Sequence, residues 1–467
     1  MLEYAVVILI ISSFLMLVLK RDVIAIFAIL FSFFMMTFLF LRGGSEIVMF
    51  GGWVPPFGIV WFMDGFNLLI GFLIAGICSL VAVYSKGYIK ERKERFYTLL
   101  CLLTAGLLGV CLTGDIFNMY VFFEILSVAS YGLVSFFLDE DSIEGAFKYL
   151  IMGSFGSSFV LLGIALIYGM AGTLNFADLA VKVSPSPAFM AALGMIIGGF
   201  SLKAALIPFH AWKPDAIEGT PAPVGAVFTS ASSAIGVYGI IRILFVFGLL
   251  GMNTALIGLG VFTMVIGALL ALVQVNVKRM LAYSGISQIG YIVMVMGFGT
   301  TLGITSGLYH ILNNTIIKGL LFMSVGCAIY LTGKENLNEM GVKSTPLLIC
   351  TGVGVLSMAG IPPLNGFVSK FLIFMASWEI NPMLTVLAVI TSAITLAYGL
   401  KIFSSIFLTS KKSSGKIPGV MMIPVIVLTL LCIIIGVFPQ LGLSVVEPAT
   451  HALLNQNQYI SAVLGGG

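Results

Sequence analysis

The stretch FMAALGMIIGGFSLKAALIP, residues 189–208, is an apolar run with a lysine near its end and a proline closing it. A bilayer core about 30 Å thick needs about 20 consecutive apolar residues in a helix. Similar runs fill the chain, which has 467 residues, of which 60% are hydrophobic and only 9% charged. Because soluble domains carry about 25% charged residues, the sequence predicts an all-α integral membrane protein.

Hydropathy, with breaks at charges and at Gly/Pro clusters, predicts about fourteen transmembrane helices. No long polar stretch separates them, so we expect a single polytopic membrane domain over 1–467. The expected spans are 4–19, 23–41, 66–85, 97–113, 116–138, 147–170, 189–208, 223–248, 254–274, 280–299, 303–331, 347–376, 383–409 and 419–440.

Basic residues gather in alternate loops, and the opposite set of loops carries only Arg42 and Lys182. Because lysine and arginine favour cytoplasmic loops, we expect a multi-pass protein of the cell membrane with both termini outside. The loops expected in the cytoplasm hold Lys20, Arg21, Lys86, Lys90, Arg92, Lys93, Arg95, Lys148, Lys213, Lys278, Arg279, Lys334, Lys343, Lys411, Lys412 and Lys416.

Two predicted helices contain breaks, the seventh at Pro208 and the twelfth at adjacent prolines within 360–366. Proline removes a helical hydrogen bond, and the freed backbone survives in lipid only where protein or water satisfies it. The breaks lie five spans apart, and an odd offset reverses orientation, so two inverted five-helix repeats are predicted. Paired broken helices of this kind indicate a transport site. The expected division is 1–96 for N-terminal helices, 97–248 and 254–409 for the repeats, and 410–467 for a C-terminal helix and tail.

Few ionisable residues lie inside the predicted spans, where a charge costs about 2.5–3.5 kcal/mol on insertion scales. Glu124 is the only acid deep in a span, roughly 13 Å along its helix from Asp115. A carboxyl at that depth suits a proton carrier, and the alternative is a structural ion pair. Lys203 precedes the first break, and Lys370 follows the second and is expected at the equivalent place. A buried lysine can release its proton near neutral pH, although each could instead be structural.

His310 and Lys318 are eight residues apart, which places them on nearly one helix face, with Asn314 in the polar band between them. They predict a hydrated proton relay, or else interhelical hydrogen bonds. Asn314 and three further residues, Lys148, Arg242 and Lys401, are auxiliary candidates for ion transport. Lys148 lies at the start of its span, while Arg242 and Lys401 lie nearer span ends and could snorkel to the interface instead.

Several kinds of chemistry are excluded by motifs that the sequence lacks. There is no G-x-x-x-x-G-K-[ST] phosphate loop, no histidine pair at haem spacing within a span, and no cysteine pattern for an iron–sulfur cluster. The six cysteines all fall in apolar runs. We therefore expect no cofactor or metal in this chain and no catalytic redox site. The net charge of +4, with lysines in loops, gives no indication of a nucleic-acid partner.

Five ordered motifs lie along the middle of the chain: GDIFNMYVFFEILSVASYGL at 114–133, LKAALIPFHAWKPDAIEGTPAPV at 202–224, VKRMLAYSGISQIGY at 277–291, YHILNNTIIKGLLFM at 309–323 and SMAGIPPLNGFVSKF at 357–371. Together they resemble the antiporter-like subunits of Mrp-type Na⁺/H⁺ antiporters, energy-converting membrane-bound hydrogenases and respiratory complex I. The resemblance implies fourteen helices in two inverted repeats, and ion translocation along a line formed by Glu124, Lys203, His310, Lys318 and Lys370.

The chain departs from the family pattern at three positions. Ala234 stands where the family commonly has a lysine, and Asn314 where it has a second histidine. Neither side chain can carry a proton by ionisation, so a relay would need water there, or one half-channel is inactive. Lys213 stands where an apolar residue is common, and the sequence offers no reason for it. The side chains expected to hold such water are Thr229, Ser230, Ser232 and Ser233.

The first hypothesis is a proton- or Na⁺-translocating subunit of a larger membrane complex. Its partners would be other membrane subunits and, if redox energy drives the complex, peripheral subunits with iron–sulfur or other redox cofactors. A degenerate subunit kept for assembly and a stand-alone secondary transporter are the alternatives. The sequence leaves open Na⁺ or H⁺, the direction of transport and the source of energy.

Overall fold

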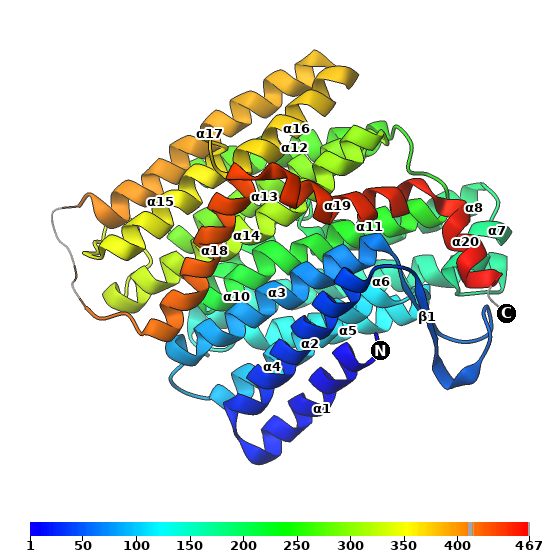
Figure 1. Cartoon of the computed structure of the whole chain (residues 1–467), viewed down its shortest axis with the longest axis horizontal. Helices are drawn as coiled ribbons and strands as arrows, with labels where there is room; N and C mark the ends of the chain where they lie inside the picture. Colours follow the sequence, from blue (N-terminus) through cyan, green and yellow to red (C-terminus); the bar gives the residue numbers. More distant parts are fainter. Residues whose placement is uncertain (410–412, 414, 466–467) are drawn as a thin grey trace.

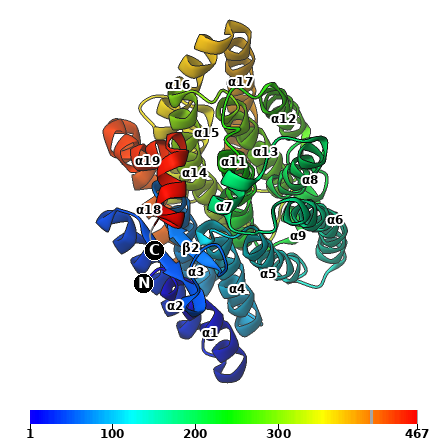
Figure 2. The same cartoon turned by 90° about the vertical axis from the view of Figure 1, so that its right-hand side faces the viewer.

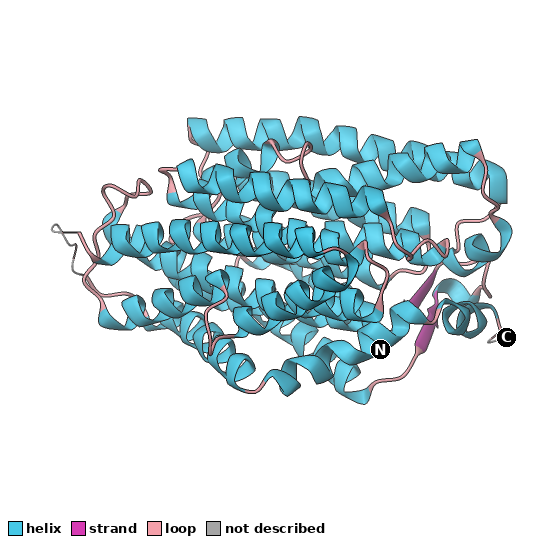
Figure 3. Cartoon of the chain, turned by 90° about the horizontal axis from the view of Figure 1, so that it is seen from above, coloured by secondary structure: helices cyan, strands magenta, loops and turns pink. Residues whose placement is uncertain are grey.

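Long apolar helices lie side by side along one direction and form almost the whole protein (Figures 1 and 3). The computed structural model describes residues 1–409, 413 and 415–465. Lys411 and Lys412 of the predicted basic loop lie outside the described residues. The helices are α1 Tyr4–Leu19, α2 Asp22–Arg42, α3 Gly65–Tyr88, α4 Lys93–Leu112, α5 Ile116–Val134, α6 Glu140–Ala171, α7 Phe176–Lys182, α8 Pro187–Ala204, α9 Trp212–Gly219, α10 Ala222–Val227, α11 Ser233–Val246, α12 Thr254–Val273, α13 Val277–Met296, α14 Thr301–Thr332, α15 Thr345–Ala359, α16 Asn365–Ile380, α17 Pro382–Phe407, α18 Gly419–Val437, α19 Pro439–Leu454 and α20 Gln456–Leu464.

Eleven helical segments in the described part of the chain are long and apolar enough to cross a membrane. The outer surface of the bundle is apolar and suits contact with lipid. Large apolar side chains such as Phe14, Phe155 and Trp378 are exposed on it. In a bilayer such residues face lipid at no cost, because the solvent is itself apolar. The chain is therefore a multi-pass membrane protein.

The protein is mostly helical, as expected, but a β-hairpin that the sequence analysis does not predict lies between α2 and α3. There β1 (Glu46–Met49) pairs antiparallel with β2 (Val60–Met63), joined through the short 3₁₀ turn η1 (Phe50–Gly52). Both strands are rich in the β-branched and aromatic residues that favour sheets. The hairpin and both chain ends lie toward the same end of the bundle (Figure 1).

Both helix breaks are present, but the two lysines lie on opposite sides of them. The helix α8 ends at Ala204, one residue after Lys203, and Ala205 adopts a left-handed φ of 60°. The second break separates α15 from α16, and Lys370 lies within α16, after the break. Lys203 thus precedes its break and Lys370 follows its own, as the sequence indicates. Gly366 lets α16 start against α15, since a Cβ there would lie 1.7 Å from the Ser357 carbonyl oxygen.

One helical rod passes through the middle of the bundle (Figure 2). It consists of α10, a π-helical turn η2 (Phe228–Ser232) and α11, and its 18-residue apolar window is entirely buried. A π-turn inside a helix carries one extra residue per turn and is frequent at functional sites. Here it coincides with the polar run expected to hold water.

The predicted C-terminal tail is folded. After α18, the helix α19 packs against α3 and α14, and α20 packs against α7. Tyr459 of α20 sits edge-on against Phe62 of β2, with ring centroids 4.9 Å apart. The amphipathic pattern of this segment is too polar for a span, which is why hydropathy alone left it unassigned.

Candidate ion-translocation site

Four lysines lie buried inside the bundle without an acidic partner. Lys203, Lys213, Lys318 and Lys370 are each at most 2% exposed. Among the residues that the structure describes, no carboxylate lies within ion-pair distance of any of them. A buried charge is costly unless it is paired, so four lysines in this state need a functional explanation.

In the first half, the Lys203 ammonium group donates to the Tyr149 hydroxyl at 2.6 Å and to Ser127 Oγ at 3.4 Å. It also lies 5.5 Å from the centre of the Phe123 ring. Lys203 comes from α8, Tyr149 from α6 and Ser127 from α5. The ammonium group therefore sits where three helices meet, beside the unwound segment that follows Ala204.

Glu124 lies on α5, one turn from Ser127, and it influences Lys203 electrostatically. The two residues do not form a direct ion pair, because no Glu124 contact falls within ion-pair distance among the described residues. Its Oε1 is buried and has no hydrogen-bond partner in the described part of the chain. The geometry does not match a static structural ion pair and leaves the carboxyl free to bind a proton or a cation.

In the second half, Lys318 and His310 lie on α14 and share a polar surface with α13 and α16. The Lys318 ammonium group donates to Ser284 Oγ and lies 3.4 Å from the Met358 sulfur. His310 Nδ1 is 3.0 Å from Ser369 Oγ, and its Nε2 is 3.1 Å from Gln288 Oε1. Both imidazole nitrogens are engaged, so this ring can pass a proton from one side to the other.

Lys370 donates a hydrogen bond to a backbone carbonyl group at the second break. Its ammonium group donates to Ser392 Oγ at 2.9 Å and to the carbonyl oxygen of Ala359 at 3.3 Å. Ala359 is the last residue of α15, so its carbonyl lacks a helical partner. The Tyr291 ring lies 5.5 Å from the ammonium nitrogen and 5.9 Å from the His310 ring. This ring lies beside both ionisable groups.

These groups affect one another. Lys318 is subject to electrostatic repulsion from Lys213 and Lys370, and His310 to repulsion from Lys318 and Lys370. Like charges in a poorly polar interior repel one another. A proton gained by one group therefore disfavours a proton on the next, which is the property that ion relay requires.

The auxiliary candidates have other partners. Arg242 does not reach the interface, because it is 2% exposed and forms a bidentate ion pair with Asp64 at 2.7 and 3.1 Å. Lys401 donates to the carbonyl oxygens of Leu272 and Gln274 at the end of α12, where a cation is favourable. Asn314 is buried at 4% exposure on the His310 helix.

Sequence reasoning did not include Lys213, Tyr149 and Ser284 in the ion line. Lys213 was assigned to a cytoplasmic loop, yet it is 0% exposed on α9. The signal that could have found it is its position five residues after the proline of the first break. Tyr149 and Ser284 carried no signal, because hydroxyl side chains are common in apolar helices.

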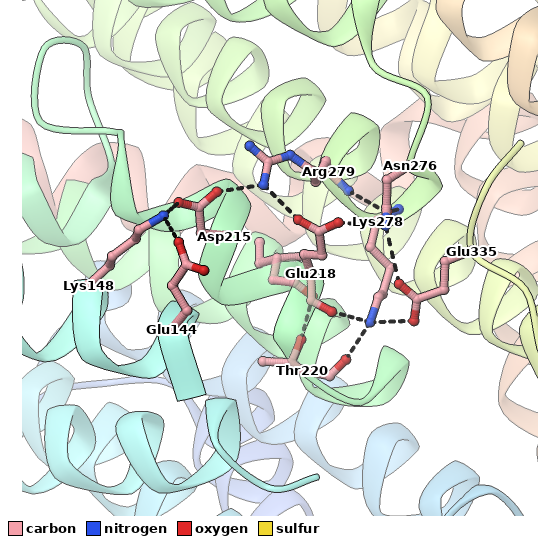
Figure 4. Close-up of polar contacts among 10 residues, drawn as sticks. Glu144, Lys148, Asp215, Glu218, Thr220, Asn276, Lys278, Arg279 and Glu335 are labelled. Atoms are coloured by element: carbon pink, nitrogen blue, oxygen red, sulfur yellow. Dashed lines mark hydrogen bonds and ion pairs between the residues drawn. The ribbon is translucent and has the colours of Figure 1, made fainter. Parts of the chain in front are cut away.

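Lys148 belongs to a network of ion pairs at one end of the bundle (Figure 4). It contacts Glu144 at 2.5 Å and Asp215 at 2.7 Å, and Arg279 contacts Asp215 at 2.5 Å. The network continues through contacts Arg279–Glu218 at 2.6 Å and Lys278–Glu335 at 2.6 Å. It ties together α6, α9, the start of α13 and the loop after α14. It thereby fixes α9, the segment that follows the first break.

Replacing Asp215 by asparagine is expected to lower the free energy of unfolding by about 1 kcal/mol, the upper range for partly exposed pairs. The change leaves the cations of Lys148 and Arg279 next to each other without the carboxylate that bridges them. Thermal unfolding of the purified protein in detergent measures the effect. Glu144→Gln is the matched control, because Glu144 is 59% exposed and contacts only Lys148 within this network. Equal losses in the two variants would contradict the bridging role.

Comparison with known proteins shows the family to which the chain belongs. Residues 113–395 match the family described as NADH:quinone oxidoreductase/Mrp antiporter, TM. NADH-quinone oxidoreductase subunit N of Desulforudis audaxviator is 35% identical over 436 residues, covering 86% of each chain. The D-type Na(+)/H(+) antiporter subunit of Bacillus subtilis is 32% identical over 437 residues, covering 90% of this chain and 89% of the relative. A chain of the membrane-bound sulfane sulfur reductase, an archaeal respiratory membrane complex, superposes with a TM-score of 0.94 at 31% identity over 99% of both chains. The chain therefore belongs to the family of antiporter-like membrane subunits shared by NADH:quinone oxidoreductases and Mrp antiporters.

Proposed function

We propose that this chain translocates protons, Na⁺ or both across the cell membrane as an antiporter-like subunit of a multisubunit complex. The observation that carries the proposal is the set of four buried lysines, which have no acidic partner among the residues that the structure describes. The relatives support it, since their names describe a Na(+)/H(+) antiporter subunit and a subunit of NADH-quinone oxidoreductase. The energy would come from a redox reaction in partner subunits or from an existing ion gradient.

The ion line consists of Glu124, Lys203, His310, Lys318 and Lys370. Protonation of Glu124 removes a negative charge that stabilises the Lys203 ammonium form. A change of charge at Lys203 then alters the balance at the next cation, and so on toward Lys370. Because each step changes the charge on a group buried in a poorly polar interior, a partner subunit can drive it by a conformational change.

The proposed topology has about fourteen transmembrane segments in two inverted repeats, 97–248 and 254–409. In this arrangement α8 with the break after it forms the seventh segment, and α15 with α16 forms the twelfth. The basic loops would face the cytoplasm and both termini the outside. The placement of both termini toward the hairpin end supports an even number of crossings (Figure 1).

The proposed partners are other membrane subunits of an Mrp-like module and, in a redox-driven complex, peripheral subunits that carry the redox cofactors. Gentle purification of the tagged chain from its native membrane tests this. Iron–sulfur subunits in the purified material would indicate a redox-driven pump, and small membrane subunits alone would indicate an antiporter. A stable chain without partners would overturn the proposed assembly.

Glu124→Gln is expected to reduce ion transport at least about tenfold while the complex still assembles, because glutamine keeps the shape but cannot ionise. The measurement is acidification of everted membrane vesicles, followed by acridine orange, together with uptake of radioactive sodium. Glu379→Gln is the matched control, since Glu379 is exposed on α16. Unchanged transport in both Glu124→Gln and Lys318→Gln would instead identify a subunit kept for assembly.

A further inference from the structure

Lys213 is the buried lysine that the proposed ion line leaves unexplained. It is the second residue of α9, directly after the first break, and its exposed fraction is 0%. Its ammonium group donates to Ser233 Oγ at 2.6 Å. Ser233 is the first residue of α11 after the π-turn, and its hydroxyl in turn donates to the Phe228 carbonyl oxygen at 2.8 Å. The π-turn thus presents an acceptor to Lys213 in the middle of the protein.

On one side, Lys213 adjoins the first half of the line. The neighbouring Trp212 stacks on Tyr149, with ring centroids 3.9 Å apart and an angle of 7° between the planes. Tyr149 accepts the hydrogen bond from Lys203. The Trp212 indole nitrogen also donates to the Leu202 carbonyl oxygen at 3.0 Å. These contacts fix α9 against α8, so that Lys203 and Lys213 are held in one rigid unit across the break.

On the other side, Lys213 adjoins the second half through α13. A Cβ added to Gly285 would lie 3.8 Å from the Lys213 ammonium nitrogen and 3.3 Å from the Thr229 side chain. The residue before Gly285 is Ser284, whose hydroxyl accepts the hydrogen bond from Lys318. The ammonium groups of Lys213 and Lys318 therefore approach the same turn of α13, and they repel one another.

A purely structural role does not account for this lysine. An ammonium group has three donors, and the described residues provide one acceptor for it, Ser233 Oγ. An apolar side chain would fill the same space without the cost of burying a polar group that is poorly paired. A lysine with few protein partners between two other buried lysines is instead suited to hold a proton in transit.

We propose that Lys213 is the central ion-carrying residue of this chain, which passes charge between Lys203 in the first half and Lys318 in the second. The inference rests on the proposed function and deepens it. Lys213 lies on α9 and places a cation beside Ser233. The next residue on α11 is Ala234, the position at which the family resemblance predicts a lysine. The relay is then complete without an ionisable residue at 234, and neither half of the chain is inactive.

The test measures ion transport in everted vesicles that contain the whole complex with a single changed residue in this chain. Lys213→Gln keeps a donor for Ser233 but removes the charge, and we expect transport to fall about tenfold or more. Lys182→Gln is the matched control, because Lys182 is 48% exposed at the end of α7 and pairs with Asp178. Lys318→Gln in the same vesicles reports on the proposed function itself.

A second pair of variants separates charge transfer from packing. Lys213→Gln combined with Ala234→Lys is expected to recover transport, because it returns a cation to the same region. Lys213→Gln combined with Ala234→Met adds similar bulk without charge and should recover none. If Lys213→Gln does not assemble, the same pair is built on Lys213→Met, whose unbranched chain fills the same space.

Two results would overturn the role of Lys213. One is wild-type transport in Lys213→Gln while Lys318→Gln has lost it, which would leave the proposed function standing without Lys213. The other is equal transport in the Ala234→Lys and Ala234→Met combinations, which would reduce Lys213 to a packing residue. Unchanged transport in Lys318→Gln would count against the proposed function and the inference together.

Discussion

Lys318→Gln is expected to lower ion transport about 100-fold, in the range contributed by a positioned proton-transfer group. Lys318 lies on α14, and its ammonium group approaches the same turn of α13 as the ammonium group of Lys213. It is subject to repulsion from Lys213 and Lys370, and it contributes to the repulsion felt by His310. Glutamine can still donate to Ser284 but cannot bind a proton, so the line would be interrupted at its middle.

Assembly of the complex should survive this substitution. Lys318 is 0% exposed and has no carboxylate partner among the described residues, so its replacement strands no opposite charge. Burying a neutral amide costs less than burying an ammonium group. The measurement is transport per assembled complex, with the amount of complex fixed by quantitative purification.

Lys334→Gln serves as the control for Lys318, since it removes a lysine from the chain just after the same helix. Lys334 is 58% exposed and pairs with Glu339 at 3.0 Å, so its loss should leave transport unchanged. Similar transport in Lys318→Gln and the native complex would remove Lys318 from the line. A loss confined to assembly would assign Lys318 a structural role.

Much of the helical arrangement could be predicted from the sequence, because a bilayer imposes one length and one composition on every crossing. The helices lie close to the expected ranges, and the prolines and glycines mark both breaks. The hairpin was missed because seven of its eight strand residues are apolar, Glu46 being the exception, and a hydropathy profile does not distinguish period two from a short apolar run. The residue at which α8 ends was not predictable, because Ala205 in a left-handed conformation carries no sequence signature.

The candidate site could be predicted as a set of residues but not as a set of contacts. Glu124, Lys203, His310, Lys318 and Lys370 were identified because an ionisable residue within an apolar run needs a reason to be there. Lys213 escaped this criterion, because the prolines and acids around it resemble a loop. The partner of Arg242 also escaped it, because Asp64 lies 178 residues earlier in the chain. Sequence spacing carries no information on contacts at that separation.

Asp64→Asn is expected to lower the free energy of unfolding by about 3–5 kcal/mol, the cost of stranding a buried charge. The side chains of Asp64 and Arg242 are 10% and 3% exposed, and the guanidinium group also donates to the Tyr238 hydroxyl at 3.1 Å. Asp64 caps α3 by accepting from the Asn67 backbone at 2.8 Å. Asparagine is an equally good cap, so this variant isolates the ion pair from the helix start.

The aromatic rings around Arg242 predict that removing its charge as well will restore stability. The guanidinium carbon lies between 5.2 and 5.8 Å from the ring centres of Phe66, Tyr238, Phe245 and Tyr459. These rings can pack against an apolar side chain, so adding Arg242→Met to Asp64→Asn should recover most of the lost stability.

Glu46→Gln is the control, because it disrupts the exposed Arg42–Glu46 pair and should cost no more than about 1 kcal/mol. Unfolding in detergent, followed by circular dichroism, gives the loss in free energy of unfolding for Asp64→Asn, for the double variant and for Glu46→Gln. A loss for Asp64→Asn no larger than that for Glu46→Gln would contradict the buried ion pair. Normal transport in the folded double variant would assign Arg242 to the stability of the bundle and exclude it from the ion line.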